Sequence, residues 1–175
     1  ESKPVLKRII HEGKGILFKR IGVSVYTNTE LEAVAEDELI EVVQSPFNML
    51  DNSYQREHNL VKLKELGKTV HTRSVFLQGL FFIEPDKIPE KLASLSPYCL
   101  MIRTIARNAN ISLGHLAIQY ALSKHYIDGV LIGVDTVEQF KTNVQWAKTP
   151  ISSSILTQID QIQVSNKKLL NPSTW

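Results

Sequence analysis

A chain of 175 residues with 43% hydrophobic and 22% charged residues can bury a real core, and its composition is ordinary for a soluble globular protein. The net charge of +2 is too small to indicate a nucleic-acid partner, and no apolar run approaches the length of a membrane span. The single cysteine, Cys99, excludes an internal disulfide and predicts a quiet buried thiol. The first residues carry no signal-peptide pattern, so we expect a cytoplasmic protein without membrane association.

Short β-rich runs alternate with helical patterns along the first half of the chain. Strands are predicted at 21–25, 39–45 and 69–72, and Pro46 is expected to limit the second of them. Helices are predicted to end near His11, to cover 30–37 after a cap at 27–29, and to run from a cap at Asn52 or Ser53 to Gly67. In the last of these helices Leu60, Leu63 and Leu66 form an apolar edge, whereas Lys62, Lys64 and Lys68 read as a solvated face.

The second half begins with a looser segment, 80–97, which we interpret as a loop or insertion before the last helices and the last strand. Ser96 and Pro97 are typical of a helix start, and Ser112 is expected to cap the next helix, which has a clean apolar stripe. A strand at 130–132, a final helix carrying Ile155, Ile159 and Ile162, and an irregular tail at 171–175 complete the chain.

The stretch VLIGVDTVEQFKTNV (residues 130–144) has the pattern of a buried strand that turns at Gly133 into a helix with Asp135 in its first turn. Gln139 and Asn143 are four residues apart and share one helix face. Such a unit is how α/β proteins build an anion or nucleotide site, although a plain strand, turn and surface helix fits the residues equally well.

Alternating strands and helices predict a parallel sheet within a single domain, 1–175. The four strands are too few for a closed eight-stranded barrel but suit either part of one or a small open doubly wound sheet.

Five stretches in this order resemble the aldo-keto reductase family. They are GKGILFKRIGVSVY (13–26), VVQSPFNMLD (42–51), TVHTRSVFLQGLFF (69–82), LGHLAIQYALS (113–123) and VLIGVDTVEQFKTNV (130–144). The resemblance implies an α/β fold that is part of a (β/α)8 TIM-type barrel, with this chain supplying strands five to eight.

The resemblance also implies hydride transfer between NAD(P)H and a small-molecule carbonyl substrate. The family's tyrosine, lysine, aspartate and histidine lie in its first half, so we expect them upstream of Glu1, assign no catalytic residue here, and expect this chain alone to be inactive. The five histidines are scattered without metal or nucleophile spacing, and no metal site is predicted. The alternative is a non-catalytic module of the same fold that senses the cofactor or serves in an interaction.

Cofactor-binding residues carry over from the family by position. Ser24 and Gln44 match the residues that hold the nicotinamide carboxamide, which needs both a donor and an acceptor. The loop after the third strand here is expected to pack on the nicotinamide and cradle the pyrophosphate, and the last loop and helix to hold the adenosine end. The residues that match are, in the first of these loops, Arg73, Ser74, Phe76, Gln78 and Gly79, and in the second segment Gly133, Asp135, Gln139 and Asn143.

Three positions depart from the family pattern. Val25 stands where many members have an asparagine, and Arg73 where many have an aromatic ring. Asp135 lies where members selective for the 2′-phosphate often carry a basic or hydroxyl side chain, so we expect preference for NADP to be weakened.

A half-barrel has a physical consequence for association. Its first and last strands would leave unpaired edges and its uncovered faces would be apolar, which invites aggregation. We therefore expect a missing N-terminal half or a self-association partner.

Overall fold

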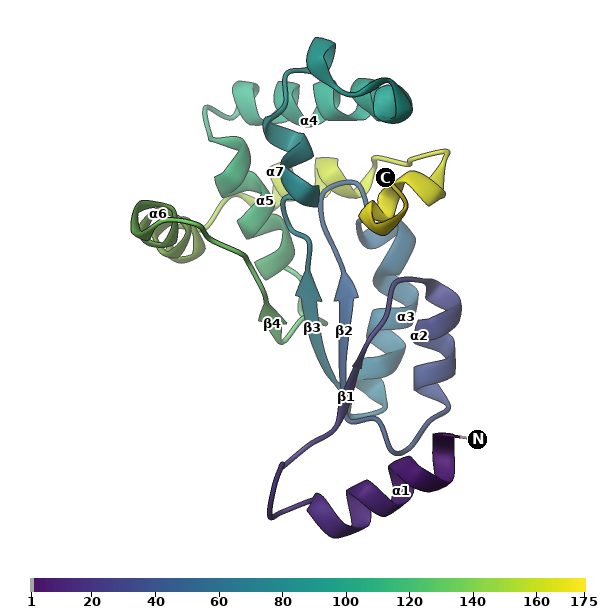
Figure 1. The fold of residues 1–175 in the computed structure, drawn as a ribbon. Helices are drawn as coiled ribbons and strands as arrows, with labels where there is room; N and C mark the ends of the chain where they lie inside the picture. Colours follow the sequence, from purple (N-terminus) through teal and green to yellow (C-terminus); the bar gives the residue numbers. More distant parts are fainter. Residues whose placement is uncertain (1) are drawn as a thin grey trace.

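The computed structural model describes residues 2–175, and its centre is a parallel four-stranded sheet (Figure 1). The strands are β1 (Gly22–Ser24), β2 (Val42–Pro46), β3 (Thr69–Arg73) and β4 (Gly129–Val130), and they pair in that order. A doubly wound sheet reverses its strand order, whereas a barrel adds each strand beside the preceding one. The observed order agrees with part of a TIM-type barrel and rules out the doubly wound alternative.

Seven α-helices connect and flank these strands in the described part of the chain. They are α1 (Ser2–Gly13), α2 (Asn28–Ala35), α3 (Ser53–Glu65), α4 (Ser96–Asn108), α5 (Leu113–Leu122), α6 (Val137–Lys148) and α7 (Ser153–Asp160). Five short 3-10 helices complete the fold: η1 (Leu77–Phe82), η2 (Pro85–Lys87), η3 (Glu90–Leu95), η4 (Lys167–Leu170) and η5 (Pro172–Thr174). The predicted loose segment 80–97 is thus mostly 3-10 helix.

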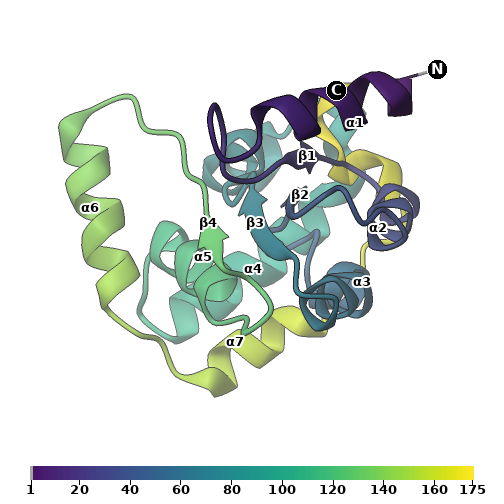
Figure 2. The same cartoon turned by 90° about the horizontal axis from the view of Figure 1, so that it is seen from below.

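The hydrophobic core lies between one face of the sheet and the helices. Val43 and Val70 point to this side and are fully buried, together with Leu31 of α2 and Leu60 of α3. Seen from below in Figure 2, α2, α3 and α5 lie on the same side of the sheet, and α6 stands apart beyond β4. This one-sided cover follows from the alternation of side chains along a strand.

The predicted helix starts at 27–29, Ser96 and Ser112 are confirmed. Thr27 and Glu30 form a capping box on α2, in which the Tyr26 and Thr27 N–H groups donate to Glu30 Oε2 at 2.7 and 2.8 Å. These bonds stabilise the carboxylate and lower the pKa of Glu30. On α5, Ser112 accepts from the His115 N–H at 3.2 Å. These two helix starts are therefore determined by hydrogen bonds between residues close together in the sequence.

Two strand predictions are wrong in extent. The second strand starts at Val42, because residues 37–40 form a turn in which Leu39 N–H donates to Asp37 Oδ1 at 3.0 Å. At its other end the strand stops at Pro46, as expected, and the following Phe47 N–H donates to Arg73 O. The last strand is Gly129–Val130 only, and Leu131 beyond it is 43% exposed, so this run is not a buried strand.

Two predictions about α3 and the turn after it are also wrong. Leu66 is 52% exposed and is the C-cap residue that follows the last turn of the helix. Lys68 is only 7% exposed, because its ammonium donates to the carbonyls of Asp37 and Ile40 at 2.8 and 2.7 Å. The aliphatic part of the side chain is buried and the ammonium group binds the carbonyls of a turn. Lys68 therefore does not belong to a solvated helix face, as was predicted.

The sheet face that no described helix covers carries polar side chains at its centre, where an apolar face was expected. Ser24, Gln44 and His71 are aligned across β1, β2 and β3, and their neighbours Val43 and Val70 point to the core. As predicted, β1 and β4 are the edge strands of the sheet, and their outer backbone edges pair with no other strand of the described chain.

Candidate cofactor site

A pocket of about 520 Å³ lies between the loop after β3 and helix α6. It brings together six of the eleven predicted cofactor residues, from segments more than fifty positions apart: Phe76, Gly79, Gly133, Asp135, Gln139 and Asn143. Sequence reasoning missed four further lining residues, Phe82, Glu138, Thr142 and Trp146. The pocket has the size usual for small-molecule sites.

The first turn of α6 fixes the polar groups of this pocket. Thr136 caps the helix by accepting from the Gln139 N–H at 3.1 Å. The side-chain carbonyl of Gln139 in turn accepts from the Asp135 N–H at 2.8 Å. Because that oxygen is engaged, the Gln139 amide offers its NH2 group to a ligand, and Asn143 follows one turn later on the same face.

Helix α6 is held at the pocket by α5. The Gln119 amide donates to the carbonyls of Trp146 and Ala147 at 2.6 and 3.0 Å. Gly114 lets the Trp146 ring approach so closely that a Cβ there would lie 2.3 Å from Trp146 Cζ3. This contact positions Trp146 as a wall of the pocket.

The loop after β3 is conformationally strained. Ser74, Leu77 and Gln78 have φ values of 62°, 46° and 53°, a region costly for residues with a Cβ. The rings of Phe76 and Phe82 pack at 5.5 Å between centroids beside the pocket. Strain of this kind is kept at ligand-binding loops, and here it brings Phe76 and Gly79 to the pocket.

The pocket is acidic. Its only charged lining residues in the described chain are Asp135 and Glu138, both exposed. A carboxylate accepts hydrogen bonds from hydroxyl groups and repels a phosphate dianion. This end of the pocket therefore offers hydrogen-bond acceptors and no described cationic side chain.

A second group of predicted residues lies on the polar face of the sheet. Arg73 donates from Nε to Ser24 Oγ at 3.4 Å and from Nη2 to Val25 O at 3.2 Å, and its guanidinium lies 4.3 Å from the centre of the Tyr26 ring. His71 stands beside Gln44 in the same register. Neither Tyr26 nor His71 was predicted; the alternation of polar and apolar residues in β3 is a signal for His71, whereas the Tyr26 contact is purely tertiary.

The remaining predicted residues are placed as follows. Ser74 accepts from Arg73 Nη1 at 3.4 Å, and Gln78 is exposed on the loop outside the pocket. Cys99 is buried as expected, and burial raises the pKa of its thiol to about 11. Among residues 2–175 no cluster of metal-ligating side chains forms. No helix in that range is long and apolar enough to cross a membrane.

Three solved structures that resemble this chain are aldo-keto reductases. AKR11C1 from Bacillus halodurans superposes in its apo form with a TM-score of 0.68 at 20% identity, over 94% of this chain and 58% of that one. Its holo form gives 0.66 at 20% identity, over 94% and 57%. The thermostable aldo-keto reductase Tm1743, in complex with the inhibitor epalrestat, gives 0.64 at 19% identity, over 91% and 53%.

The chain therefore spans between 53% and 58% of the length of these structures. At such low identity the likeness shows the fold alone. No curated protein matches the sequence at a significant level. The sequence model of the Aldo/keto reductase family, however, matches residues 4–164, which is most of the chain. Together with the parallel sheet and its strand order, this match shows that the chain belongs to the aldo/keto reductase family.

Proposed function

We propose that this chain is the cofactor-binding half of an NAD(P)H-dependent oxidoreductase that reduces a carbonyl substrate, and that its sheet corresponds to strands five to eight of the barrel. The observation that carries the proposal is the pocket beside α6. It gathers Phe76, Gly79, Gly133, Asp135, Gln139 and Asn143, which were selected from the sequence for cofactor binding. A holo form among the structural relatives supports the same reading.

The cofactor, when bound, supplies the hydride, and the residues of this chain hold and orient it. Ser24 and Gln44 present a hydroxyl and an amide side by side on the open face of the sheet, the donor and acceptor pair that a carboxamide needs. Arg73 lies next to Ser24 and offers a planar cation for stacking. The loop after β3 and helix α6 bind the pyrophosphate and the adenosine end of the cofactor.

We further propose that the acidic end of the pocket favours NADH over NADPH. Asp135 and Glu138 would accept from ribose hydroxyls and repel a 2′-phosphate, and no described lining residue carries a positive charge. The test is to titrate NADH and NADPH against the Asp135→Asn/Glu138→Gln variant. Its affinity for NADPH should rise relative to NADH, whereas Glu90→Gln, an exposed acid on η3, should leave the ratio unchanged.

A direct test of the function combines binding with turnover. Fluorescence titration of the 175-residue chain should show saturable NADH binding, which Gln44→Leu weakens, without reduction of a carbonyl panel. The complete gene product should oxidise NADH in the presence of a carbonyl compound. Binding without turnover in the complete product would instead support the sensing or interaction alternative, and absence of binding in both would refute the proposal.

A further inference from the structure

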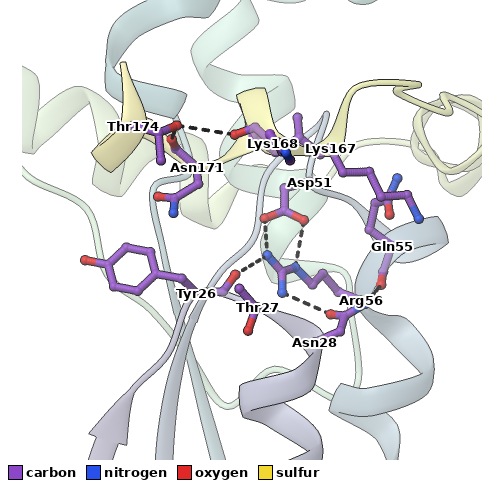
Figure 3. A pocket seen from close by; sticks show the side chains of 11 residues that line it. Tyr26, Thr27, Asn28, Asp51, Gln55, Arg56, Lys167, Lys168, Asn171 and Thr174 are labelled. Carbon is purple, nitrogen blue, oxygen red and sulfur yellow. Dashed lines mark hydrogen bonds and ion pairs between the residues drawn. The ribbon is translucent and has the colours of Figure 1, made fainter.

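A second pocket, of about 490 Å³, lies between the loop before α2, the first turn of α3 and the C-terminal tail. In Figure 3, Lys167, Lys168 and Asn171 of the tail lie above its centre, and Tyr26 and Thr27 lie below. It shares no lining residue with the pocket beside α6. The two pockets are therefore separate sites.

A buried ion pair forms the floor of this pocket. Arg56 donates from Nε and Nη2 to the two oxygens of Asp51, both at 2.7 Å, and the side chains are 8% and 2% exposed. The same guanidinium donates to Tyr26 O at 2.7 Å and to Asn28 Oδ1 at 3.0 Å. The floor is therefore rigid, and both oxygens of its carboxylate are engaged by Arg56.

The free polar groups of the pocket include several unused donors. Lys167 and Lys168 form no ion pair with any described residue. The Nε2 atom of Gln55 is buried and has no hydrogen-bond partner. Asp51 is the only acid among the described lining residues, so Arg56 and the two lysines leave the lining with a charge of +2.

The walls of the pocket suit an organic molecule rather than a bare ion. The half-exposed Tyr26 ring and buried Leu170 supply apolar surface. Within the tail, Thr174 Oγ1 donates to Asn171 O at 2.9 Å and Trp175 Nε1 to Leu169 O at 3.0 Å, and Leu170 packs the segment into the hydrophobic core. A cavity with apolar walls and a few convergent donors is the usual form of a small-molecule site.

We infer that this pocket binds the anionic group, phosphate or carboxylate, of a small molecule, with Lys167, Lys168 and Gln55 Nε2 as its donors. Two ammonium groups would supply charge-assisted hydrogen bonds, and the amide would satisfy the donor that lacks a partner in the folded chain. The inference is independent of the proposed function, because it rests on other residues.

The experiment is isothermal titration of the full chain at low ionic strength with inorganic phosphate and, separately, with malonate. The double variant Lys167→Met/Lys168→Met should bind the preferred anion at least about tenfold more weakly. Gln55→Glu should do the same, since it replaces an unpaired donor by a carboxylate without removing any hydrogen bond that Nε2 makes. Lys91→Met, at an exposed position on η3, should bind as the parent chain does.

The outcomes separate this site from the cofactor pocket. Saturating NADH should leave the anion titration unchanged, and the double lysine variant should keep its NADH affinity. If NADH does not bind at all, the anion titrations still decide the inference. Absence of saturable binding for both anions, or equal binding by the parent chain and the double lysine variant, would overturn it.

Discussion

Replacing Arg56 by methionine should destabilise the chain severely. The guanidinium makes four hydrogen bonds, two of them to Asp51, whose side chain is 2% exposed. Its loss leaves a buried carboxylate without a counter-ion, which typically costs about 3–5 kcal/mol. Since a domain is stable by only roughly 5–15 kcal/mol, urea unfolding should reveal a large shift of the midpoint.

The loss should also depend on pH in a defined direction. Burial raises the pKa of Asp51, and Arg56 and Arg73 act against that effect. Without Arg56 the folded-state pKa rises further above the unfolded value of about 3.9, so stability falls as pH rises through the folded value. Arg56→Met should therefore be less destabilised at pH 5 than at pH 8.

A double variant serves as the control for this reasoning. Asp51→Asn/Arg56→Met removes the buried charge together with its partner and should regain at least about 1 kcal/mol over Arg56→Met. A loss below about 1 kcal/mol in Arg56→Met, equal at both pH values, would place the pair among weak surface ion pairs and refute the argument.

Three further substitutions test contacts that hold the fold together. Gly114→Ala should displace Trp146, because the added Cβ would lie 2.3 Å from its ring, and NADH titration should show weakened binding with a changed tryptophan emission. Lys68→Met should cost about 1–3 kcal/mol in urea unfolding, because two carbonyls lose a donor. Glu30→Gln should destabilise at pH 7 but progressively less in acid: two backbone N–H groups lower the pKa of Glu30, so its contribution is complete above the unfolded pKa of about 4.3 and is lost as pH falls through the folded value.

The parts of the fold that were predicted from sequence are those that short-range patterns encode. Thr27 with Glu30, and Ser112 before its apolar stripe, carry their hydrogen-bond partners within a few residues, so both helix starts were found. Lys68 was misjudged because its acceptors lie about thirty residues away, in a turn whose shape depends on Asp37. Burial of a charged residue is decided by such distant carbonyls, and spacing within a helix does not report them.

The same distinction applies to the pocket beside α6. Gly133 and Gln139 were already indicated by the local strand, turn and helix pattern, whereas Gly79 came only from the family resemblance, which carries tertiary information that periodicity lacks. Trp146 was missed, although it lies seven residues beyond Gln139 on the same helix face and helical spacing alone would have pointed to it. Phe82 is different, because it reaches the pocket through the turn that the positive φ angles of the preceding loop create.

The open side of the sheet changes the expected mode of association. An apolar face would bind any hydrophobic partner, but Ser24, Gln44 and His71 make this face polar, and Arg73 is engaged with Ser24 and Tyr26. The free edges of β1 and β4 offer a partner backbone groups with a fixed direction and spacing, beside exposed apolar side chains such as Val137 and Phe140 of α6. We expect a partner that pairs there to be held by backbone hydrogen bonds between parallel strands, as within the sheet itself. A complementary half-barrel meets that condition at both edges at once, and the polar residues would then line the enclosed centre, where a cofactor that approaches Ser24 and Gln44 needs hydrogen-bonding groups.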